Sequence, residues 1–398
     1  MLKLFWKPAN WVGVPADPKW DAMADVLAAD SFGGVALQTL QRGEAAVQPV
    51  SVALAARLDA WLGQRSKTAP VTIVAHGFLY DPKPSAAGDG TDDPFNVIYA
   101  IPGEGRPAQL SLMPLVGECD ELGGALQDVA IAFAWMSTGT LSDHARAHWD
   151  SSYKLACLDL APLAARALAL VVAHLAHRRV PVRVLAHSLG TRLFSQAIGL
   201  LKAAGVATSI ERAVLLEGAE FCVDAAANFS GCTFDVISVA SRTDKVLHWG
   251  GTQACHPVRE NGSAAACVIG YDGLGGNTRW VDLQFDAPGL VQWFRSGAAP
   301  NGHVYRVDAV AEDDIHPDAG MGHWACYTNT TNRLLVRDLV LDPKLGVGGL
   351  VAVHVPQGVD STMWGHFNGC AVPPTPTTVS GRQAGAGEFA GGGGGETG

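Results

Sequence analysis

A serine lies where a short strand pattern meets a helical pattern. The apolar, β-branched stretch 182–187 runs directly into Ser188, Gly190 follows two residues later, and an apolar helical periodicity begins at once. A tight strand-to-helix turn of this kind presents a serine side chain at the end of a sheet, and small residues on either side, here Ala186 and Gly190, tolerate its backbone. The spacing small-x-Ser-x-Gly therefore predicts that Ser188 is a nucleophile. The alternative is a serine in an ordinary turn between a strand and a helix.

A serine hydroxyl needs a base within hydrogen-bond reach, and that base needs an acid to orient it. Asp244 follows the apolar run 234–240 by one short turn, so we expect its carboxylate at the same sheet edge as Ser188. Glu217, which follows the preceding strand pattern, is the second candidate acid. A solvated turn aspartate paired with a neighbouring basic side chain is the alternative for Asp244.

The later histidines supply the candidates for the base. His323 lies within 320–327, after small residues that let a loop reach over the sheet and before an aromatic cluster and the last helical pattern. This position favours His323, whereas His303 and His316 are weaker candidates. His248 follows the acid too closely to reach the nucleophile from the same turn. A histidine that only packs near a helix start is the alternative.

Short apolar runs alternate with helical patterns along the chain, which is typical of α/β proteins with a mostly parallel central sheet flanked by helices. Polar residues follow several of these runs directly, among them His76. Carboxyl ends of parallel strands share one edge, where such sheets bind ligands. The expected strands are 2–6, 71–75, 130–135, 182–187, 213–216 and 234–240, and the expected helices are 20–29, 52–65, 119–125, 142–177 (with a turn near 159–162), 191–204 and 329–339.

The chain is expected to form one main domain. Residues 71–370 constitute this domain, interrupted by loop regions at 83–117 and 248–322, and connections of that length are usually functional. The Trp-rich segment 1–70 is expected to pack onto it rather than fold alone. The Pro/Gly-rich stretch 371–398 has too few apolar residues to order itself and predicts a flexible tail.

Composition restricts the class of protein. The chain has 398 residues, of which 48% are hydrophobic, and a net charge of −10, which disfavours nucleic acid and anionic membranes as partners. The apolar stretch 161–176 contains Arg166 and His174, so we expect a buried helix and no membrane span. Without a secretory signal or a CxxC pair, unpaired thiols and a cytoplasmic location are expected, although Cys255 and Cys267 could bridge a loop.

Two motifs together resemble the α/β-hydrolase fold superfamily. Leu185-Ala186-His187-Ser188-Leu189-Gly190 and Ser241-Arg242-Thr243-Asp244 are similar to the elbow and the acid turn of bacterial serine hydrolases of unknown function with an Ala-His-Ser-x-Gly elbow. His76-Gly77 matches a strand end of the same family. The resemblance covers residues 70 to 340 or so, and it departs from the family pattern at the two long loop regions. It implies a parallel sheet and the chain order serine, acid, histidine.

An α/β-hydrolase also needs two backbone N–H groups that bind the oxyanion of the reaction. We expect these donors from Leu189, at the positive end of a helix, and from Phe78. Gly77 would let the backbone approach a substrate, and the aromatic side chains of Tyr80 and Trp135 at strand ends are candidates for lining an acyl pocket, although core packing explains them equally well.

These residues together predict a serine esterase. Ser188 would form an acyl-enzyme with a small carboxylic ester, His323 would act as general base and then acid, and Asp244 would orient it. Acyltransferase, amidase or thioesterase chemistry uses the same three residues, and a catalytically silent binding protein is the alternative from another class. No cofactor and no metal are implied, and the sequence indicates no oligomeric state.

Overall fold

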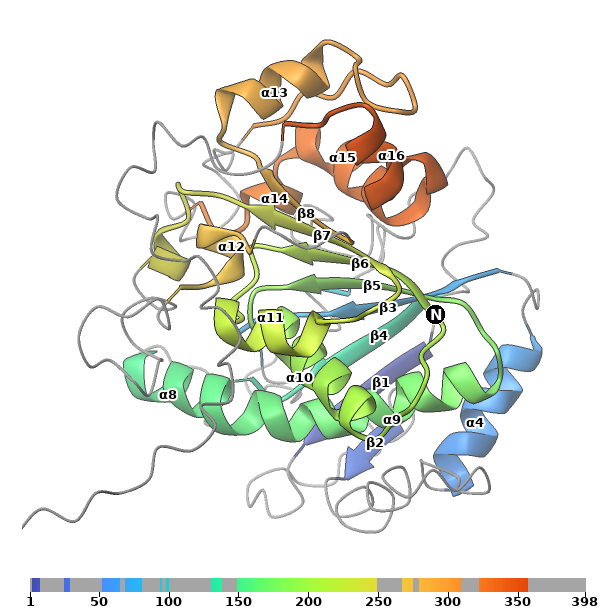
Figure 1. The fold of residues 1–398 in the computed structure, drawn as a ribbon. Coiled ribbons are helices and arrows are strands. Elements are labelled where there is room, and N and C mark those ends of the chain that lie inside the picture. The colour runs from blue at the N-terminus through green and yellow to red at the C-terminus, as the bar shows by residue number, and fades with distance from the viewer. Residues whose placement is uncertain are drawn as a thin grey trace, which may run out of the picture.

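The core of the computed structural model is an eight-stranded sheet with the strand order β2-β1-β4-β3-β5-β6-β7-β8 (Figure 1). The structure describes residues 2–7, 25–28, 52–64, 69–80, 94, 98–99, 130–137, 149–248, 267–274, 279–308 and 322–356. Every pairing between neighbouring strands is parallel. The strands are β1 Leu2–Lys7, β2 Asp25–Ala28, β3 Val71–Ala75, β4 Ala130–Trp135, β5 Val182–His187, β6 Ile210–Leu216, β7 Asp235–Ala240 and β8 Trp280–Gln284.

The central strands are continuous apolar runs because both of their faces are covered. Every residue of β3 and β4 is buried. Successive side chains point to opposite faces of a strand, so Ile73 belongs to one hydrophobic core cluster and Val74 to the other. The fold class expected from the sequence, a parallel sheet flanked by helices, is confirmed.

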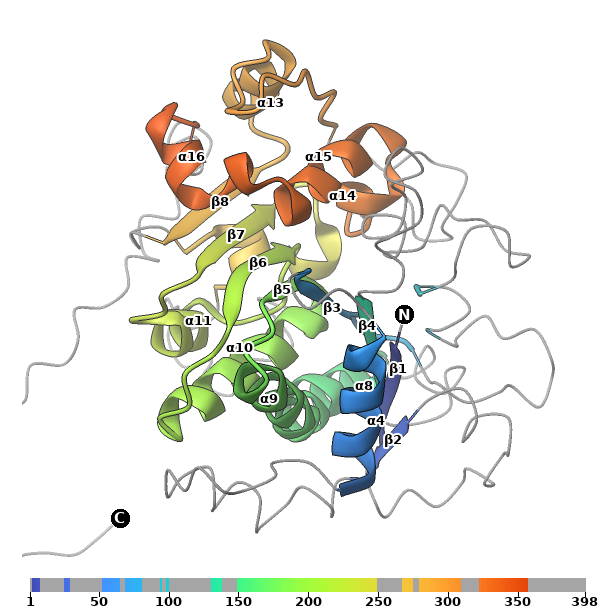
Figure 2. The ribbon, with the colours of Figure 1, turned by 90° about the vertical axis from the view of Figure 1, so that its right-hand side faces the viewer.

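Helices form a layer on each face of the sheet (Figures 1 and 2). The helices α9 and α10 pack with β1, β3 and β5 in one core cluster, whereas α13, α15 and α16 pack with β7 and β8 in the other. The helices are α4 Val52–Gly63, α8 Trp149–Leu155, α9 Ala161–His177, α10 Leu189–Ala203, α11 Cys222–Phe229, α12 Ile269–Asp272, α13 Pro288–Arg295, α14 Ala325–Thr328, α15 Thr330–Leu341 and α16 Val347–Ala352.

The N-terminal segment extends the central sheet. The strand β1 pairs with β4, and β2 pairs with β1. The prediction of a helix over 20–29 is wrong at Asp25–Ala28, where the chain forms β2 instead. Hydrogen bonding to a neighbouring strand overrides a weak local helical periodicity, since propensity is only a small term beside tertiary pairing.

The strand β8 is absent from the sequence prediction, which treated 248–322 as loops. Its sequence, Trp-Val-Asp-Leu-Gln, contains two polar residues and yet is buried throughout. Asp282 explains the contradiction, because its carboxylate accepts the Trp280 indole N–H at 2.7 Å and the Leu274 N–H at 3.0 Å. A buried acid whose oxygens accept hydrogen bonds cannot be distinguished from an exposed acid by sequence alone.

The apolar helical region before β5 is one long helical segment. A π-helical turn, Ala156–Leu160, joins α8 to α9 where the sequence suggested a turn. The segment Ser152–His177 is long and apolar enough to cross a membrane, but 67% of its most apolar window is buried inside the molecule. Such a helix is also the usual core helix of a water-soluble domain, so it is weak evidence for a membrane span.

Cys267 forms a disulfide bond. The expectation of unpaired thiols is therefore wrong for this residue, because pairing depends on proximity in the fold and not on spacing in the sequence. Four other cysteines, at 157, 222, 232 and 326, are free, so the partner is among those outside the described residues. The expected helix at 119–125, nearly all of the loop at 83–117 and the tail beyond 371 also lie outside the described residues.

Candidate active site

Ser188 occupies a strained turn, called the elbow below, between β5 and α10. Its backbone has φ 54° and ψ −126°, which non-glycine residues adopt only where their surroundings hold them. Its N–H donates to the Leu216 carbonyl at 3.0 Å, and its carbonyl accepts the N–H groups of Thr191 and Ala219, each at 3.0 Å. The end of β6 and the first turn of α10 therefore fix the strained residue.

Two glycines let the elbow pack against the end of β3. A Cβ atom on Gly77 would lie 2.7 Å from Ser188 Cβ and 3.2 Å from Ser188 Oγ. A Cβ atom on Gly190 would lie 2.6 Å from the carbonyl oxygens of both Ala75 and His76. Distances below 3.0 Å are essentially never seen for Cβ contacts, so both positions require glycine. Gly77 thus lies directly against the serine.

The structure joins His323 to Asp244 and not to Glu217. His323 Nδ1 lies 2.6 Å from Asp244 Oδ2, and both side chains are buried. The other carboxylate oxygen of Asp244 accepts the Leu247 N–H at 2.8 Å. Because Nδ1 faces the acid, Nε2 is the ring nitrogen left to exchange a proton with a nucleophile.

The segment that carries His323 lies tightly against the acid turn. Gly322 has φ +74°, and a Cβ atom there would lie 2.5 Å from the Thr243 carbonyl oxygen. Only glycine allows both that conformation and that approach. Among the described residues no hydrogen bond joins His323 to Ser188. Such contacts are often long in structures without a ligand and shorten when substrate binds.

His187, next to the serine, contacts the same segment. Its Nε2 lies 3.1 Å from the His323 carbonyl oxygen, and its ring lies 4.8 Å from the rings of both His323 and Tyr327, measured between centroids. Its adjacency to the nucleophile was the one available signal for this hydrogen bond.

Glu217 is buried below the Asp244–His323 pair. Its backbone has φ +43°, and its Oε2 accepts the Cys326 thiol at 3.0 Å. Burial and the nearby Asp244 raise the pKa of Glu217 well above its usual range, and burial beside Glu217 likewise raises the pKa of Cys326. Glu217 thus bonds Cys326, whereas Asp244 bonds His323 directly.

Three residues of this region could hold a metal ion. One donor atom each from His187, Glu217 and His323 lie within 4.8 Å of one another, and imidazole and carboxylate are zinc ligands. Both imidazoles already make a hydrogen bond from one ring nitrogen. Their orientations are therefore explained by the protein alone.

His76 holds the backbone that leads into the expected oxyanion site. Its Nδ1–H donates to the Gly77 carbonyl at 2.9 Å, and its Nε2 accepts the Trp135 N–H at 3.0 Å. Complete burial lowers the pKa of His76 to about 3, so the ring is neutral and has one tautomer. With the Gly77 carbonyl turned toward His76, the trans peptide directs the Phe78 N–H to the opposite side.

The other predicted binding residues take different positions. Leu189 is the first residue of α10, so its N–H has no acceptor within the helix. Phe78 and Tyr80 are partly exposed next to the elbow loop. Trp135 is fully buried, and its indole N–H donates to the His76 carbonyl at 2.9 Å. The structure thus places Trp135 in the core, where it stabilises His76, and not on an open surface.

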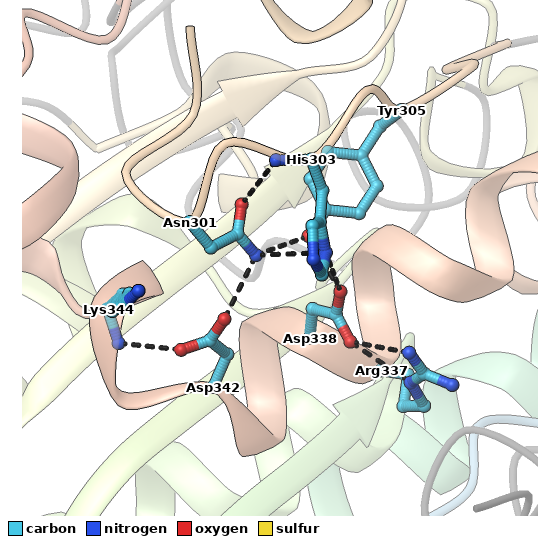
Figure 3. Close-up of polar contacts among 7 residues, drawn as sticks. All are labelled: Asn301, His303, Tyr305, Arg337, Asp338, Asp342 and Lys344. Carbon is cyan, nitrogen blue, oxygen red and sulfur yellow. Dashed lines mark hydrogen bonds and ion pairs between the residues drawn. The ribbon is translucent and has the colours of Figure 1, made fainter. Parts of the chain in front are cut away.

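The competing histidines that the structure describes lie elsewhere. His303 belongs to a polar cluster between α13 and α15, where its Nδ1 lies 3.4 Å from Asp338 Oδ2 (Figure 3). In the same cluster the Tyr305 hydroxyl donates to Asp338 and Asn301 donates to Asp342. His248 lies four residues after Asp244, and its ring contacts that of Tyr271 at a tilted angle, with 5.2 Å between the centroids. His316 lies outside the described residues.

Ser188 follows β5 and Asp244 follows β7 by one short turn, and His323 reaches the same place through its contact with Asp244. These strands end at the same edge, since all of them are parallel. No family model, curated protein or solved structure matches the chain. The function therefore has to be inferred from the geometry of these residues.

Proposed function

We propose that the chain is a serine hydrolase of the α/β-hydrolase type that cleaves a carboxylic ester. One observation carries the proposal: the 2.6 Å contact between His323 and Asp244 lies at the sheet edge where Ser188 is held in a strained elbow. Serine, acid and histidine follow one another in the chain order of that superfamily. The parallel sheet with flanking helices is compatible with this fold.

The proposed reaction proceeds through an acyl-enzyme. His323 Nε2 takes the proton of the Ser188 hydroxyl while the oxygen attacks the ester carbonyl carbon. The resulting oxyanion accepts hydrogen bonds from the N–H groups of Phe78 and Leu189. The tetrahedral intermediate then expels the alcohol, which takes the proton from His323. Water attacks the acyl-enzyme by the same steps and releases the acid.

The strained serine favours an enzyme over a silent binding protein. The backbone of Ser188, with φ 54° and ψ −126°, costs free energy, and strained residues of this kind cluster at functional sites. A binding protein would have no need of the buried Asp244–His323 pair. Transfer of the acyl group to another alcohol, an amine or a thiol would use the same residues, so the acceptor is the open part of the proposal.

A panel of p-nitrophenyl esters tests this function. We expect hydrolysis by the wild type and loss of it in Ser188→Ala and His323→Ala to a similar degree, because triad members act as one unit. His303→Ala is the matched control, since His303 belongs to the separate cluster of Figure 3 and should leave the rate unchanged. Full activity in Ser188→Ala would refute the proposal.

A further inference from the structure

The segment that carries the candidate base is held at both of its ends. At its first residue, the His323 carbonyl oxygen accepts the Nε2–H of His187 at 3.1 Å. At its last residue, Cys326 donates its thiol to Glu217 at 3.0 Å and also its backbone N–H to the same carboxyl group. The four residues 323–326 thus have one hydrogen-bonding partner at each end.

The two partners come from the ends of neighbouring strands. His187 is the last residue of β5 and pairs in register with Leu216, and Glu217 follows Leu216 directly (Figure 1). Their side chains meet below the segment, with His187 Nε2 and Glu217 Oε2 3.8 Å apart. Both residues are at least 98% buried. We name this pair the clamp.

The hydrogen bonds that define the clamp reach the main chain of the base segment and the Cys326 thiol, and none of them involves a nitrogen of the His323 ring. The His187 bond goes to the main chain of His323, whereas the Nδ1 atom of that ring is bound by Asp244. Three consecutive strands of the sheet, β5, β6 and β7, therefore restrain the base through different atoms. Ser188 shares its peptide bond with His187, so the same hydrogen bond links the nucleophile to the base segment.

Resting on the proposed function, we propose that His187 and Glu217 are positioning residues that fix the segment 323–326, and through it the His323 ring, against the elbow. His187 contributes more than Glu217 to positioning the ring, because its hydrogen bond reaches the carbonyl group of His323 itself. Displacement of a reacting group by about 1 Å can cost about 10²-fold in rate. Neither residue touches the substrate in this account.

A pair of substitutions separates positioning from packing. The Nε2 amide of glutamine can occupy the place of the imidazole Nε2–H, so His187→Gln keeps a donor for the His323 carbonyl, whereas His187→Leu keeps the volume and removes the donor. We expect His187→Leu to lose kcat by about 10²-fold with KM nearly unchanged. We expect His187→Gln to recover most of that loss.

A second measurement does not depend on activity. The short bond between His323 and Asp244 should give a far-downfield imidazole proton resonance in the wild type. We expect that resonance to broaden or disappear in His187→Leu and to persist in His187→Gln. The same two substitutions at His174, a buried histidine that bonds Asp59 on α4, are the control and should change neither kcat nor the resonance.

Equal losses of kcat in His187→Leu and His187→Gln, or a rise in KM alone, would overturn the proposal.

If His187→Leu does not fold, Cys326→Ala releases the other end of the segment and should weaken the resonance and lower kcat by a smaller factor. If the wild type hydrolyses no ester, the proposed function fails, whereas the resonance still decides whether the clamp fixes His323. A resonance unaffected by both His187→Leu and Cys326→Ala refutes the clamp.

Discussion

His323 can act as a base only if one ring nitrogen is committed to an acid and the other faces the serine. The Asp244 carboxylate lies 2.6 Å from His323 Nδ1, and its other oxygen accepts the backbone N–H of Leu247. Glu217, the second acid suggested by the sequence, is buried beside Cys326 and bonds that thiol instead. The sequence favoured Asp244 over Glu217 on position alone, because the contact that distinguishes the two acids depends on which loop reaches the histidine.

Asp244→Asn should therefore reduce activity far more than Glu217→Gln. Asparagine keeps the size but favours the wrong imidazole tautomer, which costs up to about 10⁴-fold in rate in the best-studied triad. Glutamine at 217 keeps the size of the side chain and an acceptor for the Cys326 thiol. Values of kcat/KM on one ester measure both effects. A larger loss for Glu217→Gln would place the acid one strand earlier.

His76 should make the stability of the fold depend on pH. Its pKa falls from 6.5 to about 3 on folding because the ring is buried. Between these values the unfolded chain binds a proton that the folded chain rejects, so stability is full above pH 6.5 and decreases as the pH falls toward 3. The slope from this residue is at most about 1.4 kcal/mol per pH unit.

Urea unfolding of His76→Gln between neutral and acidic pH measures this contribution. We expect the variant to be less stable at neutral pH, since it loses the bond to Gly77 or Trp135, but to have a flatter pH dependence than the wild type. His177→Gln, at an exposed position on α9, is the control and should keep the wild-type slope. Identical slopes in His76→Gln and the wild type would show that His76 does not stay neutral.

At the scale of the elements, strands made of continuous apolar residues were predictable from the sequence. A strand with a buried, hydrogen-bonded polar side chain was not. The boundaries of β3 and β4 follow from their sequences because both faces of each strand are buried. The strand β8 escaped detection because the buried Asp282 carboxylate accepts hydrogen bonds from Trp280 and Leu274 that only the fold provides. The clamp was not predictable either, because it depends on contacts made only in the folded chain, such as that between Cys326 and Glu217.

The elbow also predicts a contrast between two helical glycines. Gly190 and Gly289 are each the second residue of a helix, in α10 and α13. Gly190→Ala would force a methyl group to 2.6 Å from two carbonyl oxygens and should cost about 1–3 kcal/mol together with most of the activity. Gly289→Ala meets no atom within 4 Å and should be neutral or stabilise by about 0.5–1 kcal/mol.

Urea midpoints and esterase rates of the two variants measure this contrast. The comparison controls for residue type and helix position, so the difference reports the approach of the elbow to the end of β3. If both variants were equally stable and active, the elbow could not pack as closely as the structure shows.

At the scale of the whole molecule, the sheet is one continuous structure that includes the N-terminal strands. The strands that carry the candidate site are at its centre and far edge, whereas β1 and β2 extend the other edge. The order serine, acid, histidine is a prediction from the sequence, where each of the three residues follows a strand pattern or precedes a helical one. For Cys267 the sequence favoured a free thiol and offered a bridge to Cys255 only as the alternative, whereas the structure has this cysteine in a disulfide.

Alkylation of the native protein without reductant tests this disulfide. Peptide mass spectrometry after denaturation in excess alkylating reagent should find Cys157, Cys222, Cys232 and Cys326 modified and Cys267 protected until a reductant is added. Modification of Cys267 without reduction would contradict the bond. A persistent disulfide would also argue against the reducing cytoplasm as the place where the protein works.

The central claim is that Ser188 is an activated nucleophile, and covalent labelling tests it most directly. A fluorophosphonate probe reacts with a serine only where a base and an oxyanion site assist the attack. After treatment of the folded protein, peptide mass spectrometry should locate one adduct, on Ser188, with strongly reduced labelling in Asp244→Asn and none after heat denaturation. An adduct on a different serine, or an unmodified Ser188 in a folded protein that hydrolyses esters, would contradict the account.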